Sequence, residues 1–268
     1  MATLVCFHAH PDDEAIATAG TMAAAAAAGH RVVLVCATRG EHGEVVDGVL
    51  DDGEQLGIRR TSETHEAAAH LGADRVDFLG YLDSGMMGEP ENDHPGSFWQ
   101  ADVEEAAHRL AAILRHEEAD VLTAYDDHGG YGHPDHIQVH RVGVRAAELA
   151  GTPRVFEATM NRTRIIEGIT AQIEAGLIDP DEWDGPDPTD PERSDFGSPE
   201  EIITHGIDVT GHLDAKRAAM AAHASQIGDD HFFLAMDDET FATAMGTEWF
   251  IEHGVERAGA PLRDDLFV

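Results

Sequence analysis

Residues 2–14 read ATLVCFHAHPDDE and place charged side chains directly behind an apolar run. The run Thr3–Ala9 is short and continuous, which is typical of a buried strand. Ala15–Ala28 then has the length and alanine content of a helix, and Gly29 ends it. Two histidines and three carboxylates thus crowd at the end of the strand, where charges are costly unless something pairs with them. The stretch predicts a strand, a functional turn and a helix.

The same unit of strand and helix recurs up to Met160. Four further apolar runs are predicted as strands: Arg31–Thr38, Arg75–Tyr81, Asp120–Tyr125 and Arg154–Met160. The helices predicted between them are Glu54–Leu71, Ala101–Glu117 and Pro134–Ala150. This alternation predicts an α/β fold, Rossmann-like, with a mostly parallel sheet and helices on both faces. Ligands bind beyond the carboxyl ends of the strands in such sheets, so the loop at 126–132 is expected to face residues 8–14 across a cleft.

The pattern is looser after residue 160. The helices predicted there are Arg162–Ala175, one from Gly211 onward, and one from Asp238 to about Met245. Asp179–Pro199 is rich in proline and aspartate and too polar to form core, so we expect a small C-terminal surface excursion over the cleft rim. An interdomain linker is the alternative, but the sequence that follows is short for a domain. We therefore expect a single domain over residues 1–268.

The charge balance excludes several partners. The chain has 17 basic and 52 acidic residues, which gives a net charge of −35. Such a protein repels nucleic acid and anionic membrane surfaces, so neither is an expected partner. The acidic residues are scattered along the chain, which is consistent either with adaptation to high salt or with an ordinary acidic protein.

Two features bear on location. Cys6 and Cys36 each lie inside a predicted strand, which favours buried thiols over a disulfide. The N-terminus lacks the pattern of a signal peptide, and the longest apolar run, Ala23–Ala28, is far too short to span a bilayer. We expect a soluble, cytoplasmic protein, with homo-oligomers possible.

His10 and Asp13 lie three residues apart at a strand-to-helix turn, where their side chains can converge. Zinc accepts such nitrogen and oxygen ligands, and a catalytic zinc takes three from the protein. The best candidate for the third is His136, because His133-Pro134-Asp135-His136 repeats the His–Pro–Asp order after the fourth predicted strand. We expect one Zn²⁺ per chain, with Fe²⁺ possible on the same ligands.

Three neighbours of these ligands have candidate roles in catalysis. Asp12 is not assigned as a metal ligand and is suited to act as a general base toward water. His133 can stabilise an oxyanion or protonate a leaving amine, and Tyr131 can lend its hydroxyl to the same oxyanion. Taken alone, each motif is also typical of a hydrogen-bonded histidine or an acidic helix start. His8, His140 and Asp135 are expected to be structural or to orient a ligand.

Four stretches in the first 160 residues carry a resemblance: HPDDE, TRGEHGE, LGYLDSGM and GYGHPDH. Together they resemble the zinc-dependent N-acetylglucosaminyl deacetylases. That superfamily includes the phosphatidylinositol-glycan de-N-acetylases (PIG-L) and the LmbE-like bacterial enzymes. Within it, the chain is most similar to the branch of mycothiol deacetylases and mycothiol-conjugate amidases. The C-terminal third matches less clearly.

The resemblance implies an LmbE-like fold and a role for each matched residue. His10, Asp13 and His136 match zinc ligands and Asp12 the general base, with His133 and Tyr131 facing the tetrahedral intermediate. Three substrate contacts are implied only by the resemblance: Arg60 (with Arg59 as the fallback), Asp83, and Glu44 or Glu41.

The implied enzyme is a hydrolase that removes an N-acyl group, expected to be acetyl, from a glucosamine-containing small molecule. The acidic surface favours a neutral or cationic glucosaminide. The alternatives are a metal-dependent phosphoesterase and a carbohydrate-binding protein with a structural metal.

Overall fold

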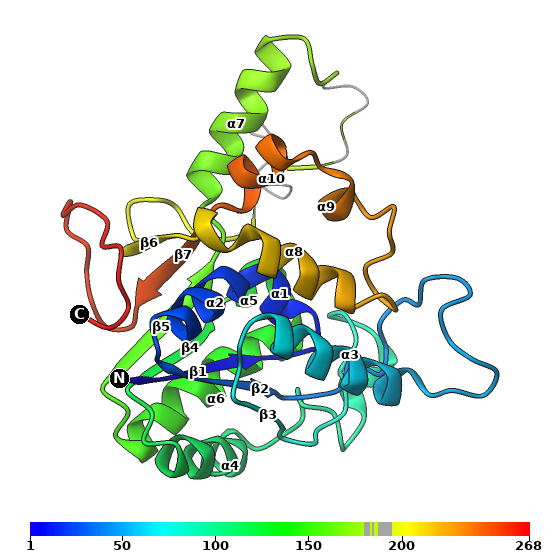
Figure 1. Ribbon diagram of the computed structural model, residues 1–268. Helices are drawn as coiled ribbons and strands as arrows, with labels where there is room; N and C mark the ends of the chain where they lie inside the picture. The colour runs from blue at the N-terminus through cyan, green and yellow to red at the C-terminus, as the bar shows by residue number, and fades with distance from the viewer. Residues whose placement is uncertain (180–182, 184, 187–194) are drawn as a thin grey trace.

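A seven-stranded sheet forms the centre of the computed structural model, which describes residues 1–179, 183, 185–186 and 195–268 (Figure 1). The strand order is β3-β2-β1-β4-β5-β7-β6. The strands are β1 (Thr3–His8), β2 (Arg31–Cys36), β3 (Arg75–Phe78), β4 (Val121–Tyr125), β5 (Arg154–Thr159), β6 (His205–Asp208) and β7 (Thr247–Glu252). The first five are parallel, while β7 pairs antiparallel with both β5 and β6. The mostly parallel sheet confirms the predicted fold class.

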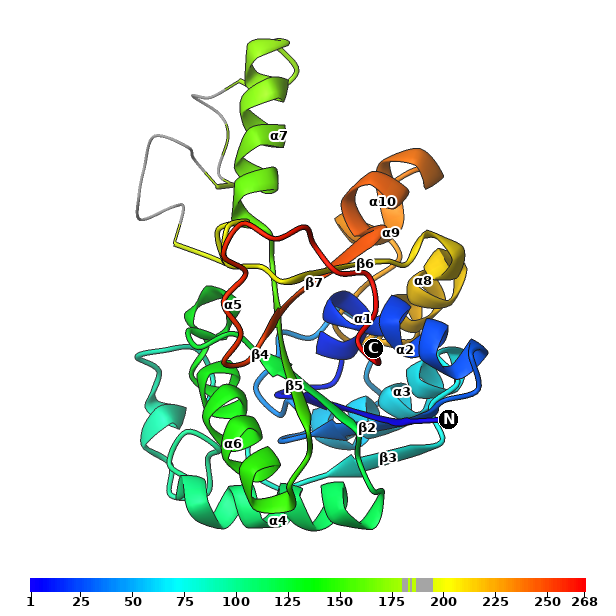
Figure 2. The ribbon, with the colours of Figure 1, turned by 90° about the vertical axis from the view of Figure 1, so that its left-hand side faces the viewer.

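Helices cover both faces of the sheet (Figure 2). They are α1 (Asp13–Ala17), α2 (Ala19–Ala27), α3 (Leu56–His70), α4 (Val103–His116), α5 (Gly129–Gly132), α6 (Pro134–Ala150), α7 (Arg162–Glu174), α8 (Leu213–Ala222), α9 (Phe232–Ala235) and α10 (Asp238–Met245). One face carries α4 and α6, and the other carries α1, α2 and α3 with α8 packed against them. α7 projects away from the sheet.

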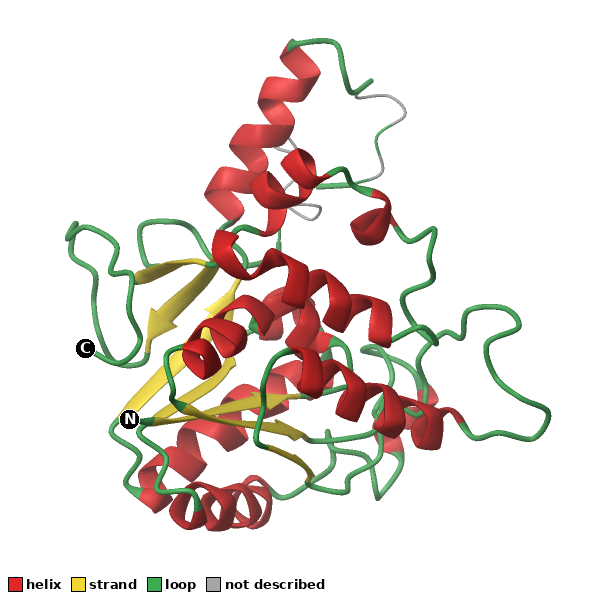
Figure 3. Cartoon of the chain, viewed as in Figure 1, coloured by secondary structure: helices red, strands yellow, loops and turns green. Residues whose placement is uncertain are grey.

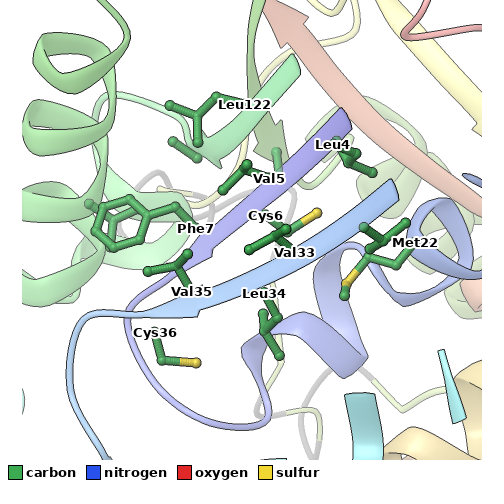
Figure 4. Close-up of a cluster of buried hydrophobic side chains, with 14 of the residues drawn as sticks. Leu4, Val5, Cys6, Phe7, Met22, Val33, Leu34, Val35, Cys36 and Leu122 are labelled. Atoms are coloured by element: carbon green, nitrogen blue, oxygen red, sulfur yellow. The ribbon is translucent and has the colours of Figure 1, made fainter. Parts of the chain in front are cut away.

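The core lies around β1 and β2, whose side chains are almost all buried (Figure 4). Both faces of a parallel sheet are covered, which explains why these strands are continuous apolar runs. Cys6 and Cys36 are buried free thiols, as predicted. Burial raises the pKa of Cys6 to about 12, so this thiol is inert rather than nucleophilic.

The predicted helix at Ala15–Ala28 is in fact two helices, α1 and α2, separated at Thr18. The Thr18 hydroxyl bonds the ring of His8, and the two carboxylate oxygens of Glu248 accept the backbone N–H groups of Gly20 and Thr21. The break therefore leaves few unsatisfied donors at the start of α2.

The C-terminal third adds strands that the sequence did not predict (Figure 3). β6 and β7 extend the sheet beyond β5, while α10 forms as predicted and the helix expected from Gly211 is α8, which ends at Ala222. Most of the predicted excursion at 179–199 falls outside the described residues. None of the helices in the described part of the chain is both long and apolar enough to cross a membrane.

Candidate metal centre and catalytic site

The two predicted loops meet at the carboxyl edge of the sheet. His10 and Asp13 follow β1, His136 lies in the first turn of α6, and β1 and β4 are parallel neighbours. One Asp13 oxygen lies 3.4 Å from His10 Nδ1, and the other lies 3.4 Å from His136 Nε2. The three residues are buried or nearly so. The structure thus brings the predicted ligand residues together across 126 positions of sequence.

Two further sets of ligand atoms converge within 4.8 Å of one another among the described residues. They are His10 with His133 and His136, and His10 with Asp83 and Asp135. His10 belongs to both sets and has two nitrogens to share. Its Nε2 faces Asp135 at 3.2 Å and Asp83 at 3.4 Å, while its Nδ1 faces Asp13.

A metal-binding histidine usually donates its other ring N–H to a carboxylate. His10 fits this rule if Nε2 carries the proton toward Asp135 and Nδ1 is the ligand atom. Asp135 is fully buried and accepts hydrogen bonds from the Ser84 backbone N–H and hydroxyl, which hold it in place. The residues present therefore fit a cation beside Asp13.

The electrostatics of the cluster favour charged carboxylates. Burial alone would raise the pKa of Asp13, but His136 and His10 lower it well below its usual value. Burial would likewise raise the pKa of Asp83, yet its contact with His10 and its backbone hydrogen bonds lower it. For His10, burial opposes the charged form, but the contacts with Asp13, Asp135 and Asp83 raise its pKa well above 6.5.

Asp12 lies beside the ligands and next to Arg60, whose Nη2 donates to Asp12 Oδ2 at 3.1 Å. Burial raises the pKa of Asp12 to about 6, and the positive charge of Arg60 limits the rise. A carboxylate with a pKa near neutrality is well suited to accept a proton in catalysis. The side chain keeps 19% of its surface exposed, so solvent reaches it.

His133 and Tyr131 line the same cluster. His133 Nδ1 accepts a hydrogen bond from the Asp135 backbone N–H, which leaves Nε2 as the protonated nitrogen and a donor. Burial and the neighbouring His10 lower the pKa of His133 to about 4. Tyr131 is half exposed on α5, and its hydroxyl lies 3.5 Å from His136 Nε2. Gly129 lets this loop pack on α6, because a Cβ there would lie 2.7 Å from the Cβ of His136.

Arg60 is almost fully buried, and its guanidinium donates to the carbonyls of Gly40 and Pro11 as well as to Asp12. This placement supports the Asp12 turn, whereas the sequence resemblance implied a sugar contact. The fallback, Arg59, pairs with Glu54 instead.

Asp83 and one of the two candidate glutamates lie together at the site. The Asp83 carboxylate accepts the backbone N–H groups of His42 and Gly85, and Glu41 accepts the backbone N–H of Asp83. Glu44 is exposed. Glu41 is therefore the glutamate that the structure ties to Asp83.

Tyr125 is a residue that the sequence analysis missed. Its ring stacks on His136 with centroids 4.3 Å apart, and its hydroxyl lies 2.8 Å from His8 Nδ1. Its position at the carboxyl end of β4 was the available signal, because that edge carries the site.

Comparisons with known proteins agree with this geometry. The sequence profile described as GlcNAc-PI de-N-acetylase, PIG-L, matches residues 5–147. The chain belongs to the PIG-L family. A relative in Acidothermus cellulolyticus, 44% identical over 99% of this chain and 94% of its own, is named 1D-myo-inositol 2-acetamido-2-deoxy-alpha-D-glucopyranoside deacetylase. A protein of the same name in Thermobifida fusca is 41% identical over 98% of both chains.

Solved structures with a similar fold have several activities. N,N'-diacetylchitobiose deacetylase from Pyrococcus horikoshii has a TM-score of 0.60 and 24% identity over 93% of this chain and 83% of its own. GalB, a 4-carboxy-2-hydroxymuconate hydratase from Pseudomonas putida, has a TM-score of 0.61 and 18% identity over 99% and 100%. The fold alone therefore does not decide the reaction. The named deacetylases and the PIG-L profile confirm the predicted class, a hydrolytic N-deacetylase.

Proposed function

We propose that this chain is a metal-dependent hydrolase that removes the N-acetyl group from N-acetylglucosamine linked to inositol, the type of compound named for its relatives. Identities of 44% and 41% over almost the whole chain support this substrate. The observation that carries the proposal is the approach of Asp13 to both His10 and His136, with Asp12 alongside.

His10, Asp13 and His136 would hold one metal ion per chain. We propose Zn²⁺, which works in catalytic sites with three nitrogen or oxygen ligands, and Fe²⁺ is the alternative on two histidines and a carboxylate. When bound, the cation acts as a Lewis acid toward the amide carbonyl and makes water more acidic. Asp135 orients His10, and the ring of Tyr125 supports His136 from one side.

Three side chains have separate roles in the rest of the reaction. Asp12 accepts a proton from water as the water oxygen bonds to the carbonyl carbon. The His133 Nε2–H and the Tyr131 hydroxyl are proposed to donate to the oxygen on which negative charge develops, and one such donor contributes about 10²–10³ in kcat. The C–N bond then breaks and the nitrogen takes the proton that Asp12 accepted, which leaves a free amine and acetic acid, and the acid ionises to acetate.

Asp83, Arg60 and Glu44 stay predictions as substrate contacts. We propose that Asp83 accepts hydrogen bonds from sugar hydroxyls, since it lies 3.4 Å from His10 on the same buried cluster. The carboxylates around the site disfavour a phosphate dianion, which is an argument against the phosphoesterase alternative. A single working domain, a cytoplasmic location and a possible homo-oligomer also stay predictions.

The test is to load the purified protein with Zn²⁺ or Fe²⁺ and measure primary amine released from the amides and inorganic phosphate released from a phosphate monoester. The panel contains N-acetylglucosaminyl-inositol, N-acetylglucosamine, diacetylchitobiose and a phosphate monoester. We expect the inositol conjugate to be cleaved fastest. Asp12→Asn should keep the metal and lose most activity, whereas Asp127→Asn changes an exposed carboxylate near the site and should leave activity unchanged. Amine release by neither metal form from any amide would refute the proposal.

A further inference from the structure

Asp12 has an unusual backbone conformation. Its φ is 94° and its ψ is −30°, in the left-handed half of the backbone map that a non-glycine residue seldom adopts. Such a conformation costs on the order of 1–3 kcal/mol and persists only where surrounding contacts enforce it. The contacts that enforce it here must act on the backbone as well as on the carboxylate.

The Asp12 carbonyl accepts the backbone N–H of Ala15, and Glu14 contacts the Asp12 N–H. Its Oε2 accepts the Asp12 backbone N–H at 3.0 Å, and its Oε1 lies 2.6 Å from Nε2 of His223. Both Glu14 and His223 are completely buried. His223 lies just after α8, which packs over α1 and α2 in both ribbon views (Figures 1 and 2).

An acidic side chain in the first turn of a helix needs no such partner when solvent reaches it, because the helix dipole alone stabilises it. Glu14 is instead buried, where a carboxylate without a partner is costly. Within the described residues, the ring of His223 hydrogen-bonds only to Glu14, since its Nδ1 has no partner there. The ring is therefore placed to hold this one carboxylate.

A purely structural role for the pair is the competing explanation. The same helix, α8, offers a comparison, because Lys216 forms a buried ion pair with Glu248 that holds α2 and makes no hydrogen bond to Asp12. The fold thus joins α8 to the first helices without His223. What the second pair adds is the hydrogen bond to the Asp12 amide.

We infer that Glu14 and His223 form a clamp that positions the general base. The clamp holds the Asp12 backbone amide, and Arg60 holds the Asp12 carboxylate. The backbone and the carboxylate of Asp12 are therefore both fixed, which sets the direction of the side chain. Glu14 and His223 are positioning residues and touch neither substrate nor metal. This inference rests on the proposed function, because it assumes that Asp12 is the base.

Amide hydrogen exchange tests the clamp without any substrate. In the wild type the Asp12 amide should be protected, and in Glu14→Ala and His223→Ala it should exchange about 10- to 100-fold faster, since its acceptor is lost or free to move. Ser225→Ala is the matched control. Ser225 lies two residues beyond His223 and makes a buried hydrogen bond to Glu63 but none to Asp12 or Glu14. It should leave the exchange of the Asp12 amide unchanged.

Kinetics test the consequence for catalysis. Displacing a catalytic group by about 1 Å costs about 10²-fold, so Glu14→Ala should lower kcat by 10- to 100-fold with KM and bound metal nearly unchanged. Glu14→Gln should recover part of the loss, because its amide oxygen can still accept the Asp12 N–H. In an Asp12→Asn background, Glu14→Ala should cause little further loss, since both changes act through one group.

The two experiments separate the two proposals. If the Asp12 amide exchanges equally fast in the wild type and in Glu14→Ala, the clamp is wrong whatever the activity. If the clamp variants lose no more kcat than Ser225→Ala, the positioning role is overturned. Absence of amide hydrolysis by the wild type would overturn the proposed function, and with it the assignment of a base, although a protected amide would still demonstrate the contact. Where Glu14→Ala fails to fold, His223→Leu gives the same comparisons with a smaller change in volume, because leucine cannot hydrogen-bond to Glu14.

Discussion

Replacing Lys216 by methionine removes the positive half of a buried ion pair. Lys216 is 1% exposed and Glu248 is 3% exposed, and Nζ lies 2.6 Å from Glu248 Oε1 and 2.8 Å from the carbonyl oxygen of Ile16. The methionine keeps most of the volume of the side chain, so the change tests charge rather than packing. It leaves Glu248 buried without its counter-charge.

Breaking a buried pair in this way costs about 3–5 kcal/mol. The lower end applies here, because Glu248 still accepts the backbone N–H groups of Gly20 and Thr21. In a protein of this size, each kcal/mol lowers the melting temperature by about 2–4 °C. We therefore expect Lys216→Met to melt about 10 °C below the wild type.

The assay monitors thermal unfolding by circular dichroism. Unfolding by urea, monitored in the same way, gives a second measurement of stability. The control is Arg145→Met, which removes a partner from the exposed pair with Glu104 and should leave the melting temperature almost unchanged. The double variant Lys216→Met, Glu248→Gln should be more stable than the sum of the two single changes predicts, because no buried charge is left alone. A Lys216→Met protein that melts within about 2 °C of the Arg145→Met protein would refute the reasoning.

Four further outcomes are expected. His136→Ala should purify with little bound metal; a full complement measured by elemental analysis would contradict its role as a ligand. Arg60→Lys should lower kcat more than it raises KM, because lysine lacks the guanidinium group that binds Asp12. A change in KM alone would instead support a role for Arg60 as a sugar contact. Raising KCl from 0.1 M to about 2 M should raise the melting temperature, since screening relieves the repulsion of a net charge of −35; an unchanged melting temperature would favour an ordinary acidic protein. Glu117, whose pKa is held below 4.5 mainly by Arg31, stabilises the fold fully above pH 4.5 and loses this effect as the pH falls through its lowered pKa. The loss of unfolding free energy caused by Glu117→Gln should therefore become smaller as the pH falls below 4.5. A loss that does not change with pH would count against the ion pair.

The convergence of the candidate ligand residues could be predicted from the sequence because these residues lie at places that the fold class fixes. His10 and Asp13 follow one predicted strand and His136 follows another, and parallel strands end at a common edge. The repeated His–Pro–Asp order then marks both loops, and His136 directly follows its second copy. The pairing of β1 with β4 completes what the sequence pattern cannot state, which is the distance between the loops.

Other parts depend on contacts that no local pattern contains. β7 has only six residues, TEWFIE, and its partners β5 and β6 are set by tertiary packing, so its strand character is weak in isolation. Arg60 was assigned by its position in a motif, but its direction depends on carbonyl groups from two other segments. His223 meets Glu14 across 209 positions, and nothing in the sequence around it marks a buried partner.

The strand order has a consequence for synthesis on the ribosome. β6 leaves the exit tunnel before β7, yet β7 separates it from β5, so β6 has no place in the sheet until β7 has followed. A nascent chain that has emerged only as far as α7 already carries His10, Asp13 and His136, but neither His223 nor Glu248. Pairings between residues so far apart form late and slowly. The amino-terminal helices of each newly made molecule therefore lack their buried partners until the carboxyl-terminal strands have been synthesised. A prematurely released polypeptide is expected to be degraded by proteases and to have no activity.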